Sequence, residues 1–307
     1  MSNEINIHNN FMLAALTVRT WQASKTDKTT SSEVNASKNA ASNASRVVKN
    51  LLAGCDGKLK EAQSAYNAAR VWFYANSSPW GSGDDRRGSR LVPAVATIKF
   101  MTEFARLKSA ANVVLSEFLP EYLGAVQAAR LTLGDMYDES EYPTEEQVRK
   151  QFAMVMTIEP LPASTTYSQV NLPGTVVKML QDKYEQRLQA QAEDAVGDIQ
   201  GRILAEVNRM AAQLNKVASG EKTRLYETMT SNLRQMVGLA RSFAPLDPKL
   251  GALAARVEDE LLQHEVKDYK DDMALSRRVA NAATKVAAEI TAPVDFDEDA
   301  IFNIGEL

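Results

Sequence analysis

Apolar residues in the second half of the chain recur at spacings of three and four positions. The pattern runs from Val177 to Val217, and alanines and glycines weaken its middle. Residues at these spacings share one face of an α-helix, so we predict one helix of about 40 residues, or two in near continuity, with a coiled-coil-like seam. Two more helices are expected, at about 221–243 and 248–290. Together they predict a long-helix bundle.

The first half mixes strand and helix patterns. Residues 11–21 are apolar and end in β-branched and aromatic side chains. This predicts a strand, or a short helix that passes into a strand. Ser31 and Glu33 are suited to cap a helix whose apolar stripe includes residues 47–52. Further helices are expected over residues 59–75, from beyond Pro93 to about Leu133 with a break at Pro120, and over 143–156.

Residues that favour turns divide the chain. Ser, Pro, Gly and Asp over 76–88 predict a loop. Prolines and β-prone residues over 157–173 predict a linker with room for one strand. The expected fold is therefore mostly α with minor β. Its expected parts are an N-terminal mixed domain (1–156), the Pro-rich linker (157–173), a helical bundle (174–292) and an acidic tail (293–307).

Charge is distributed unevenly along the chain. The first 100 residues carry 13 Lys/Arg against 7 Asp/Glu, and the remainder carries 22 against 32. This asymmetry indicates a polyanion-binding face, although an ordinary solvated surface has the same composition. The single cysteine, Cys55, forms no internal disulfide, which favours a reducing compartment. Without a signal peptide or a membrane-length apolar run, the sequence predicts a cytoplasmic protein with no membrane contact.

Catalytic arrangements are hard to assemble from this sequence. The two histidines, His8 and His264, lie far in sequence from Cys55, and no nucleotide-binding P-loop motif occurs. Glu260, His264 and Asp268 have a spacing that would place three metal ligands on one helix face, but a solvated face has the same pattern. We therefore predict a protein that is not an enzyme and holds no cofactor or metal.

Aromatic and basic residues cluster near the N-terminus. Cations that follow phosphates and flat rings that stack on unpaired bases are typical of single-stranded nucleic-acid binding. The alternative for each aromatic ring is a place in the core. The candidate nucleic-acid-binding residues are Arg19, Trp21, Lys25, Lys28, Trp72, Trp80, Arg86, Arg87 and Arg90.

The C-terminal tail alternates acids with large apolar residues. Such a pattern favours a peptide that docks in an apolar pocket with a basic rim. The tail resembles the acidic tip of bacterial single-stranded DNA-binding proteins, but those tips end at the aromatic residue and this chain continues to Leu307. The alternative is a tail that packs on its own or a neighbouring subunit. The candidate partner-binding residues are Asp295, Phe296, Asp297, Glu298, Asp299, Ile301 and Phe302.

A second resemblance covers residues 11–175. It rests on a series of short motifs in a fixed order: Leu16 to Trp21, Lys25-x-Asp27-Lys28, Ser78 to Trp80, Arg90 to Pro93, Leu133-Gly134 and Tyr142-Pro143. In this order they resemble a phage-encoded family of unknown function whose genes often lie near those of MoxR-type AAA ATPases. The resemblance implies a bacteriophage or prophage source, and a role in nucleic-acid handling or an ATPase-linked assembly.

Three functional hypotheses follow. The leading one is a phage single-stranded DNA-binding or annealing-type protein in the host cytoplasm. It would be a homo-oligomer whose tail recruits replication or repair proteins. The alternative is a helical adaptor or scaffold that engages an AAA ATPase or a host protein without nucleic-acid contact. The third, an enzyme, lacks a recognisable catalytic arrangement.

Overall fold

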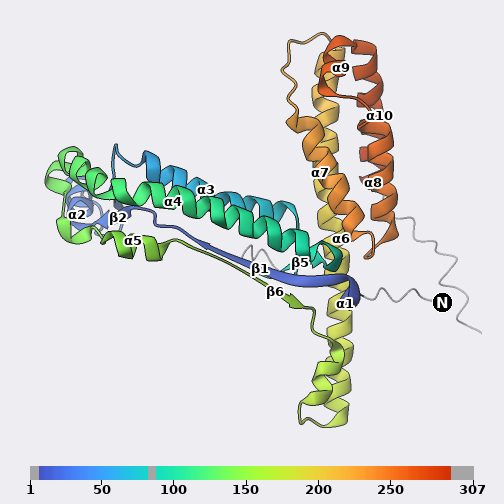
Figure 1. Cartoon of the computed structure of the whole chain (residues 1–307), viewed down its shortest axis with the longest axis horizontal. Coiled ribbons are helices and arrows are strands. Elements are labelled where there is room, and N and C mark those ends of the chain that lie inside the picture. The colour runs from blue at the N-terminus through green and yellow to red at the C-terminus, as the bar shows by residue number, and fades with distance from the viewer. Residues whose placement is uncertain (1–6, 82–87, 292–307) are drawn as a thin grey trace, which may run out of the picture. The chain divides into compact units, whose positions relative to one another are not determined.

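The computed structural model describes residues 7–81 and 88–291 of the chain. Helices predominate in them, and the strands form two small antiparallel sheets (Figure 1). This confirms the prediction of a mostly α-helical protein with minor β structure. The chain divides into two compact units. The strand-containing unit is Phe11–Leu161, and the described residues of the helical unit are 7–10 and 162–291.

In the described part of the strand-containing unit, six strands build two sheets. They are β1 (Phe11–Arg19), β2 (Ser24–Asp27), β3 (Val47–Asn50), β4 (Ser78–Pro79), β5 (Arg90–Pro93) and β6 (Ala153–Pro160). The larger sheet has the order β4-β5-β1-β6, so β1 lies between β5 and β6. The smaller sheet is the antiparallel pair of β2 and β3.

The helices of this unit are α2 (Lys28–Ser37), α3 (Gly57–Ala75), α4 (Thr97–Leu133) and α5 (Glu145–Gln151), with 3-10 turns η1 (Ala94–Ala96), η2 (Gly134–Met136) and η3 (Glu139–Glu141). α3 packs against β1 of the larger sheet, whereas α2 packs against the smaller sheet. Figure 1 shows α3 and α4 side by side along β1 and β6. Alternate residues of a strand point to the same face. Ala14, Leu16 and Val18 of β1 accordingly pack into the core that α3 and α4 supply.

The apolar residues 47–52 include a strand and not the predicted helix. β3 pairs with β2, and along it Val48 is 59% exposed while Lys49 is buried. The helix that precedes it ends at Ser37. Valine is β-branched and suits a strand. Pairing with β2, which lies some distance away in the sequence, outweighs the local helical pattern.

The longest helix of this unit contains a proline without a break. α4 continues through Pro120, where the sequence predicts a break. A proline in a helix interior removes one backbone hydrogen bond, here the bond to the Ser116 carbonyl. Phe118, Leu119 and Tyr122 surround it and are buried in the main core. Packing on both sides of Pro120 therefore holds the helix together.

Replacing Pro120 by alanine should stabilise this unit. Pro120 is exposed, and alanine restores the missing N–H donor. The gain of about 3 kcal/mol in helix propensity is offset by about 1 kcal/mol from the greater freedom of the unfolded chain. We expect the free energy of unfolding to rise by about 2 kcal/mol in a denaturant titration followed by tryptophan emission. A fall would show instead that the proline ring contributes favourable packing.

The strand-containing unit extends past the domain boundary predicted at Met156. α5 ends at Gln151, where the sequence predicts a helix through Met156. β6 follows and pairs with β1 from Ala153 to Pro160. A boundary at Met156 would cut this strand. The first residues of the predicted linker 157–173 thus belong to the sheet.

The helical unit is organised around one long helix. Its elements are α1 (Ile7–Asn10), η4 (Ser164–Gln169), α6 (Gly174–Ala218), α7 (Thr228–Phe243), α8 (Pro248–Leu261), α9 (Val266–Asp271) and α10 (Met273–Thr291). α6 has 45 residues and confirms the predicted long helix. Its second half buries a stripe that includes Ile199, Ile203 and Val207, and it packs against α7 and α10. Among the described residues, no helix combines the length and apolar character needed to cross a bilayer.

Two predicted helices are divided differently in the structure. The helix expected at 221–243 begins only at Thr228, and the one expected at 248–290 is three helices. Side-chain caps explain the breaks. Glu265 and Asp268 form a capping box at the start of α9, and Asp272 accepts two backbone N–H groups at the start of α10. Capped ends satisfy backbone groups that a continuous helix would pair internally.

Candidate nucleic-acid interface

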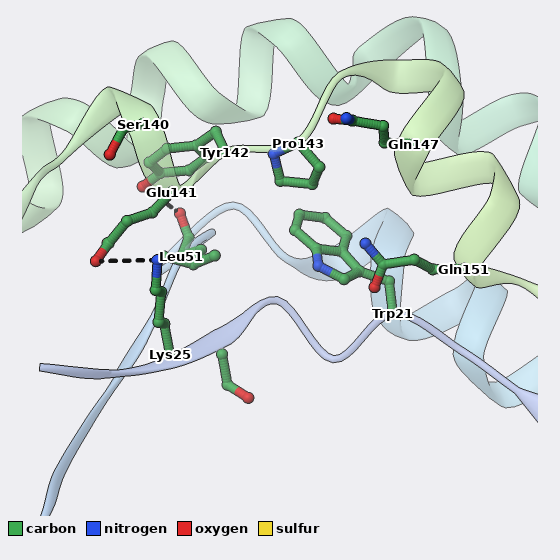
Figure 2. Close-up of a pocket in the computed structure, with 10 residues that line it drawn as sticks. Trp21, Lys25, Leu51, Ser140, Glu141, Tyr142, Pro143, Gln147 and Gln151 are labelled. Carbon is green, nitrogen blue, oxygen red and sulfur yellow. Dashed lines mark hydrogen bonds and ion pairs between the residues drawn. The ribbon is translucent and has the colours of Figure 1, made fainter.

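Two adjoining pockets lie at the end of β1 in the strand-containing unit. The first has a volume of about 510 Å³, and we call it the aromatic pocket (Figure 2). The second has a volume of about 480 Å³, and we call it the cationic pocket. Gln151, the last residue of α5, lines both. The two pockets are therefore neighbours on one surface.

Trp21 forms part of the wall of the aromatic pocket and is mainly a core residue. It is 6% exposed, and its ring meets that of Tyr122 edge to face at 5.5 Å. Its backbone carbonyl accepts a hydrogen bond from Gln63 Nε2 at 2.7 Å. Of the two alternatives for this ring, the structure supports the core. A base in the pocket would reach only a small part of the indole.

Tyr142 forms another wall and is held firmly. Its hydroxyl donates to the Leu51 carbonyl at 2.8 Å, and its ring stacks on Tyr137 with centroids 5.0 Å apart. The guanidinium of Arg130 covers Tyr137 at 5.6 Å. Burial raises the pKa of Tyr142 to about 12, so the phenol is neutral at physiological pH.

An ion-pair network lies beneath one end of the aromatic pocket. The ammonium of Lys49 is almost fully buried and lies 2.6 Å from Glu141 and 3.8 Å from Asp27. It also donates to the Met136 carbonyl at 2.7 Å. The backbone N–H of Thr30 is the main cause that lowers the pKa of Asp27. The network joins the paired strands β2 and β3 to the turn η3.

Lys25, a predicted phosphate-binding residue, shares this network. Its side chain is 51% exposed and lies 3.7 Å from Glu141 (Figure 2). The aromatic pocket is thus lined by one cation and one carboxylate that offset each other. Its other polar lining groups are uncharged, and they include the amides of Gln147 and Gln151.

The cationic pocket has a different electrostatic character. Arg19, Arg70 and Lys150 line it together with Val18, Thr20, Gln22 and Gln151. Three cations, with no carboxylate among the described lining residues, create a positive potential that attracts anions. Arg70 is anchored, because its Nη2 donates to the Val18 carbonyl at 2.9 Å.

The other two cations of this pocket are exposed. Arg19 is the last residue of β1 and makes no side-chain hydrogen bond or ion pair with another described residue. Lys150 is 72% exposed and pairs with Glu146 at 2.6 Å. A pair at that exposure is screened by water and competes weakly with a bound phosphate. Both cations therefore remain accessible to an anionic ligand.

The sequence predicts one of the three cations. Arg19 is among the candidate nucleic-acid-binding residues, whereas Arg70 and Lys150 are not. Arg70 stands in the aromatic-rich helix α3, and this was the only local signal. Lys150 lies far along the chain on α5 and had no local signal, because it reaches the pocket only through the pairing of β6 with β1.

Arg90, another predicted phosphate ligand, is a structural residue. It is buried, and it donates from Nε to Ser77 Oγ and from Nη2 to the Ser77 carbonyl, both at 2.7 Å. Its guanidinium lies over the ring of Tyr74 at 4.8 Å. These contacts use the donors that a phosphate would need. The prediction that Arg90 contacts nucleic acid is therefore not supported by its surroundings.

The remaining predicted residues lie elsewhere. Trp72 is half-buried with its ring 4.4 Å from that of Phe100, and Trp80 is half-buried with its backbone N–H donated to Ser89. Lys28 is exposed at the start of α2 but lines neither pocket. Of the predicted residues that the structure describes, three line the two pockets: Arg19, Trp21 and Lys25.

Several predicted residues lie outside the described part of the chain. Among the candidates for nucleic-acid binding these are Arg86 and Arg87. For the tail they are Asp295, Phe296, Asp297, Glu298, Asp299, Ile301 and Phe302.

The three residues with metal-ligand spacing in the helical unit do not lie on one helix in the structure. Glu260 lies in α8, which ends at Leu261, whereas His264 follows that end and Asp268 belongs to α9. The three side chains therefore do not share one continuous helix face. Within the described residues, no group of His, Cys, Asp and Glu is arranged to hold a metal ion.

No protein-family model, curated protein or solved structure matches this chain in the three comparisons made.

Proposed function

We propose that this protein binds single-stranded nucleic acid at the two adjoining pockets of its strand-containing unit. One observation carries the proposal: the cationic pocket gathers Arg19, Arg70 and Lys150, and none of its described lining residues is a carboxylate. Such a surface suits the phosphates of a nucleic-acid backbone, whose binding releases condensed counterions. A phage replication or recombination role, a homo-oligomer and partner recruitment by the tail belong to the same proposal.

The guanidinium groups supply the strongest phosphate contacts. A guanidinium offers a planar fork of donors that matches two phosphate oxygens. Arg70 is already positioned by the Val18 carbonyl, so it loses less side-chain freedom on binding. Arg19 adds a cation at the end of β1. A single strand is favoured because the adjoining aromatic pocket is useful only to a ligand with unpaired bases.

A triple variant tests this proposal. In Arg19→Ala/Arg70→Ala/Lys150→Ala we expect weaker binding of labelled oligo-dT. The slope of log K against log salt concentration should fall by about 2, because each phosphate contact with a single strand contributes about 0.7 to it. Fluorescence anisotropy at several salt concentrations measures both quantities.

A matched variant controls for net charge. Lys58→Ala/Lys60→Ala/Arg106→Ala removes the same charge from exposed, locally paired cations that line neither pocket. It should keep the salt slope of the unchanged protein. Arg19→Ala alone should lower the slope by about 0.7 without a risk to folding, because Arg19 makes no described side-chain contact. Equal slopes in the two triple variants would refute the proposed interface.

A second candidate function is the adaptor. It is favoured by an apolar stripe that runs from η1 into the start of α4, where Val95, Ile98 and Met101 are exposed at three-residue spacing. Exposed apolar stripes of this kind serve protein contacts. If the unchanged protein failed to bind oligo-dT even at low salt, this candidate would replace the first.

A further inference from the structure

We infer that the aromatic pocket is the binding site for one unpaired nucleobase, whose edge hydrogen-bonds to the amide of Gln151. The inference rests on the proposed function, because the cationic pocket would hold the adjoining phosphates. It deepens that function by separating two subsites, one for the charged backbone and one for the uncharged base.

Charge separates the two subsites. The aromatic pocket is lined by the offsetting pair of Lys25 and Glu141, 3.7 Å apart, whereas the cationic pocket is lined by three cations. A phosphate would gain little in the first and would meet the carboxylate of Glu141. An uncharged group meets no such repulsion. A neutral base in the aromatic pocket and its phosphate in the cationic pocket therefore match the charges of the two subsites.

The shape and surface of the pocket also fit a base. Its rings come from Tyr142 and Pro143 and from the accessible part of Trp21 (Figure 2). Tyr142 is fixed by its hydrogen bond to Leu51 and by its stack on Tyr137, so little ordering is needed when a ligand arrives. Flat apolar walls with a few polar groups are typical of small-ligand sites.

Gln151 supplies the free polar group. Gln147 and Gln151 lie one turn apart on α5, but the Gln147 amide oxygen already accepts the Thr144 backbone N–H at 2.8 Å. The Gln151 side chain forms no hydrogen bond with another described residue. Its amide offers both a donor and an acceptor. Each unpaired base has an edge with an adjacent donor and acceptor, so this contact tolerates all four bases.

A thermodynamic cycle that combines a change in the protein with a change in the ligand tests the inference. Affinity is measured for the full chain and for Gln151→Ala, with oligo-dT and with an abasic oligonucleotide of the same length. We expect Gln151→Ala to weaken oligo-dT binding by about fivefold or more, in the range of a bidentate base contact. Binding of the abasic ligand should not change. An equal effect on both ligands would overturn the inference.

A second readout follows Trp21 directly. In Trp72→Phe/Trp80→Phe, Trp21 is the only tryptophan, and its emission should change with oligo-dT but not with the abasic ligand. If both ligands bind in a salt-dependent manner but Trp21 emission does not change, the assignment of a base-binding subsite is refuted. The proposed function is then unaffected. Failure of both ligands to bind at low salt would remove the proposed function itself. A thymidine mononucleotide that gave the Trp21 change at lower concentration than the oligonucleotide would overturn the assignment to a strand.

Discussion

Replacing Lys49 by alanine should lower the free energy of unfolding of the strand-containing unit by about 3–5 kcal/mol, the cost of removing one partner from a buried ion pair. The side chain of Lys49 is 5% exposed, and its ammonium faces Glu141, Asp27 and the Met136 carbonyl. Without it, two largely buried carboxylates lie close together with only the half-exposed Lys25 beside them. Their repulsion and lost solvation account for the size of the effect.

Tryptophan emission isolates this effect. All three tryptophans lie in the strand-containing unit, so their emission in a denaturant titration reports on that unit alone. Lys58→Ala is the matched control, because Lys58 is exposed and pairs with Glu61 on one helix. It should cost less than about 1 kcal/mol. If Lys49→Ala also lowered the free energy of unfolding by less than about 1 kcal/mol, water would be screening the ion pairs of Lys49.

The ion pair of Lys49 and Glu141 also predicts the behaviour of a double variant. In Lys49→Met/Glu141→Gln the loss should be smaller than the sum of the two single losses, because the unpaired charge is removed with its partner. Additive losses would mean that the two side chains contribute independently.

The second large effect is expected in the helical unit. Ile203→Ala should cost about 2–5 kcal/mol, because it removes buried methyl groups and leaves a cavity in close packing. Ile203 is fully buried on α6, on the stripe that faces α7 and α10. Far-UV circular dichroism follows this loss, since most of the helix in this unit rests on that stripe.

Asn208→Ala provides the control on the same helix, because Asn208 is exposed and has no described side-chain partner. It should change the free energy of unfolding by less than about 0.5 kcal/mol. The tryptophan midpoint should stay unchanged in both variants if the two compact units unfold separately. If Ile203→Ala shifted the midpoints of both tryptophan emission and circular dichroism, the two units would unfold together.

Local patterns explain the elements that the sequence predicted well. The 45 residues of α6 follow from apolar spacings of three and four, and the strand at residues 11–19 follows from apolar β-branched residues. The helix over 57–75 is of the same kind. In each case the residues that specify the element lie within the element.

The incorrect predictions share another cause. Residues 47–50 form a strand because β2 is available to pair with them, and α4 passes Pro120 because buried neighbours hold it. The division of residues 248–291 into three helices depends on side-chain caps. These outcomes depend on competing contacts that a pattern of apolar positions does not contain.

The helical class, the long helix and the closeness of Arg19, Trp21 and Lys25 along the chain follow from local sequence patterns. Which of the basic and aromatic residues are accessible depends on how the chain folds. Burial makes Arg90 a structural residue and places Trp21 in the core, whereas packing of α3 on β1 brings Arg70 to Arg19 and pairing of β6 with β1 brings Lys150 there. The physical reason is that burial and charge neutralisation depend on contacts between distant segments, whereas helix and strand patterns are local.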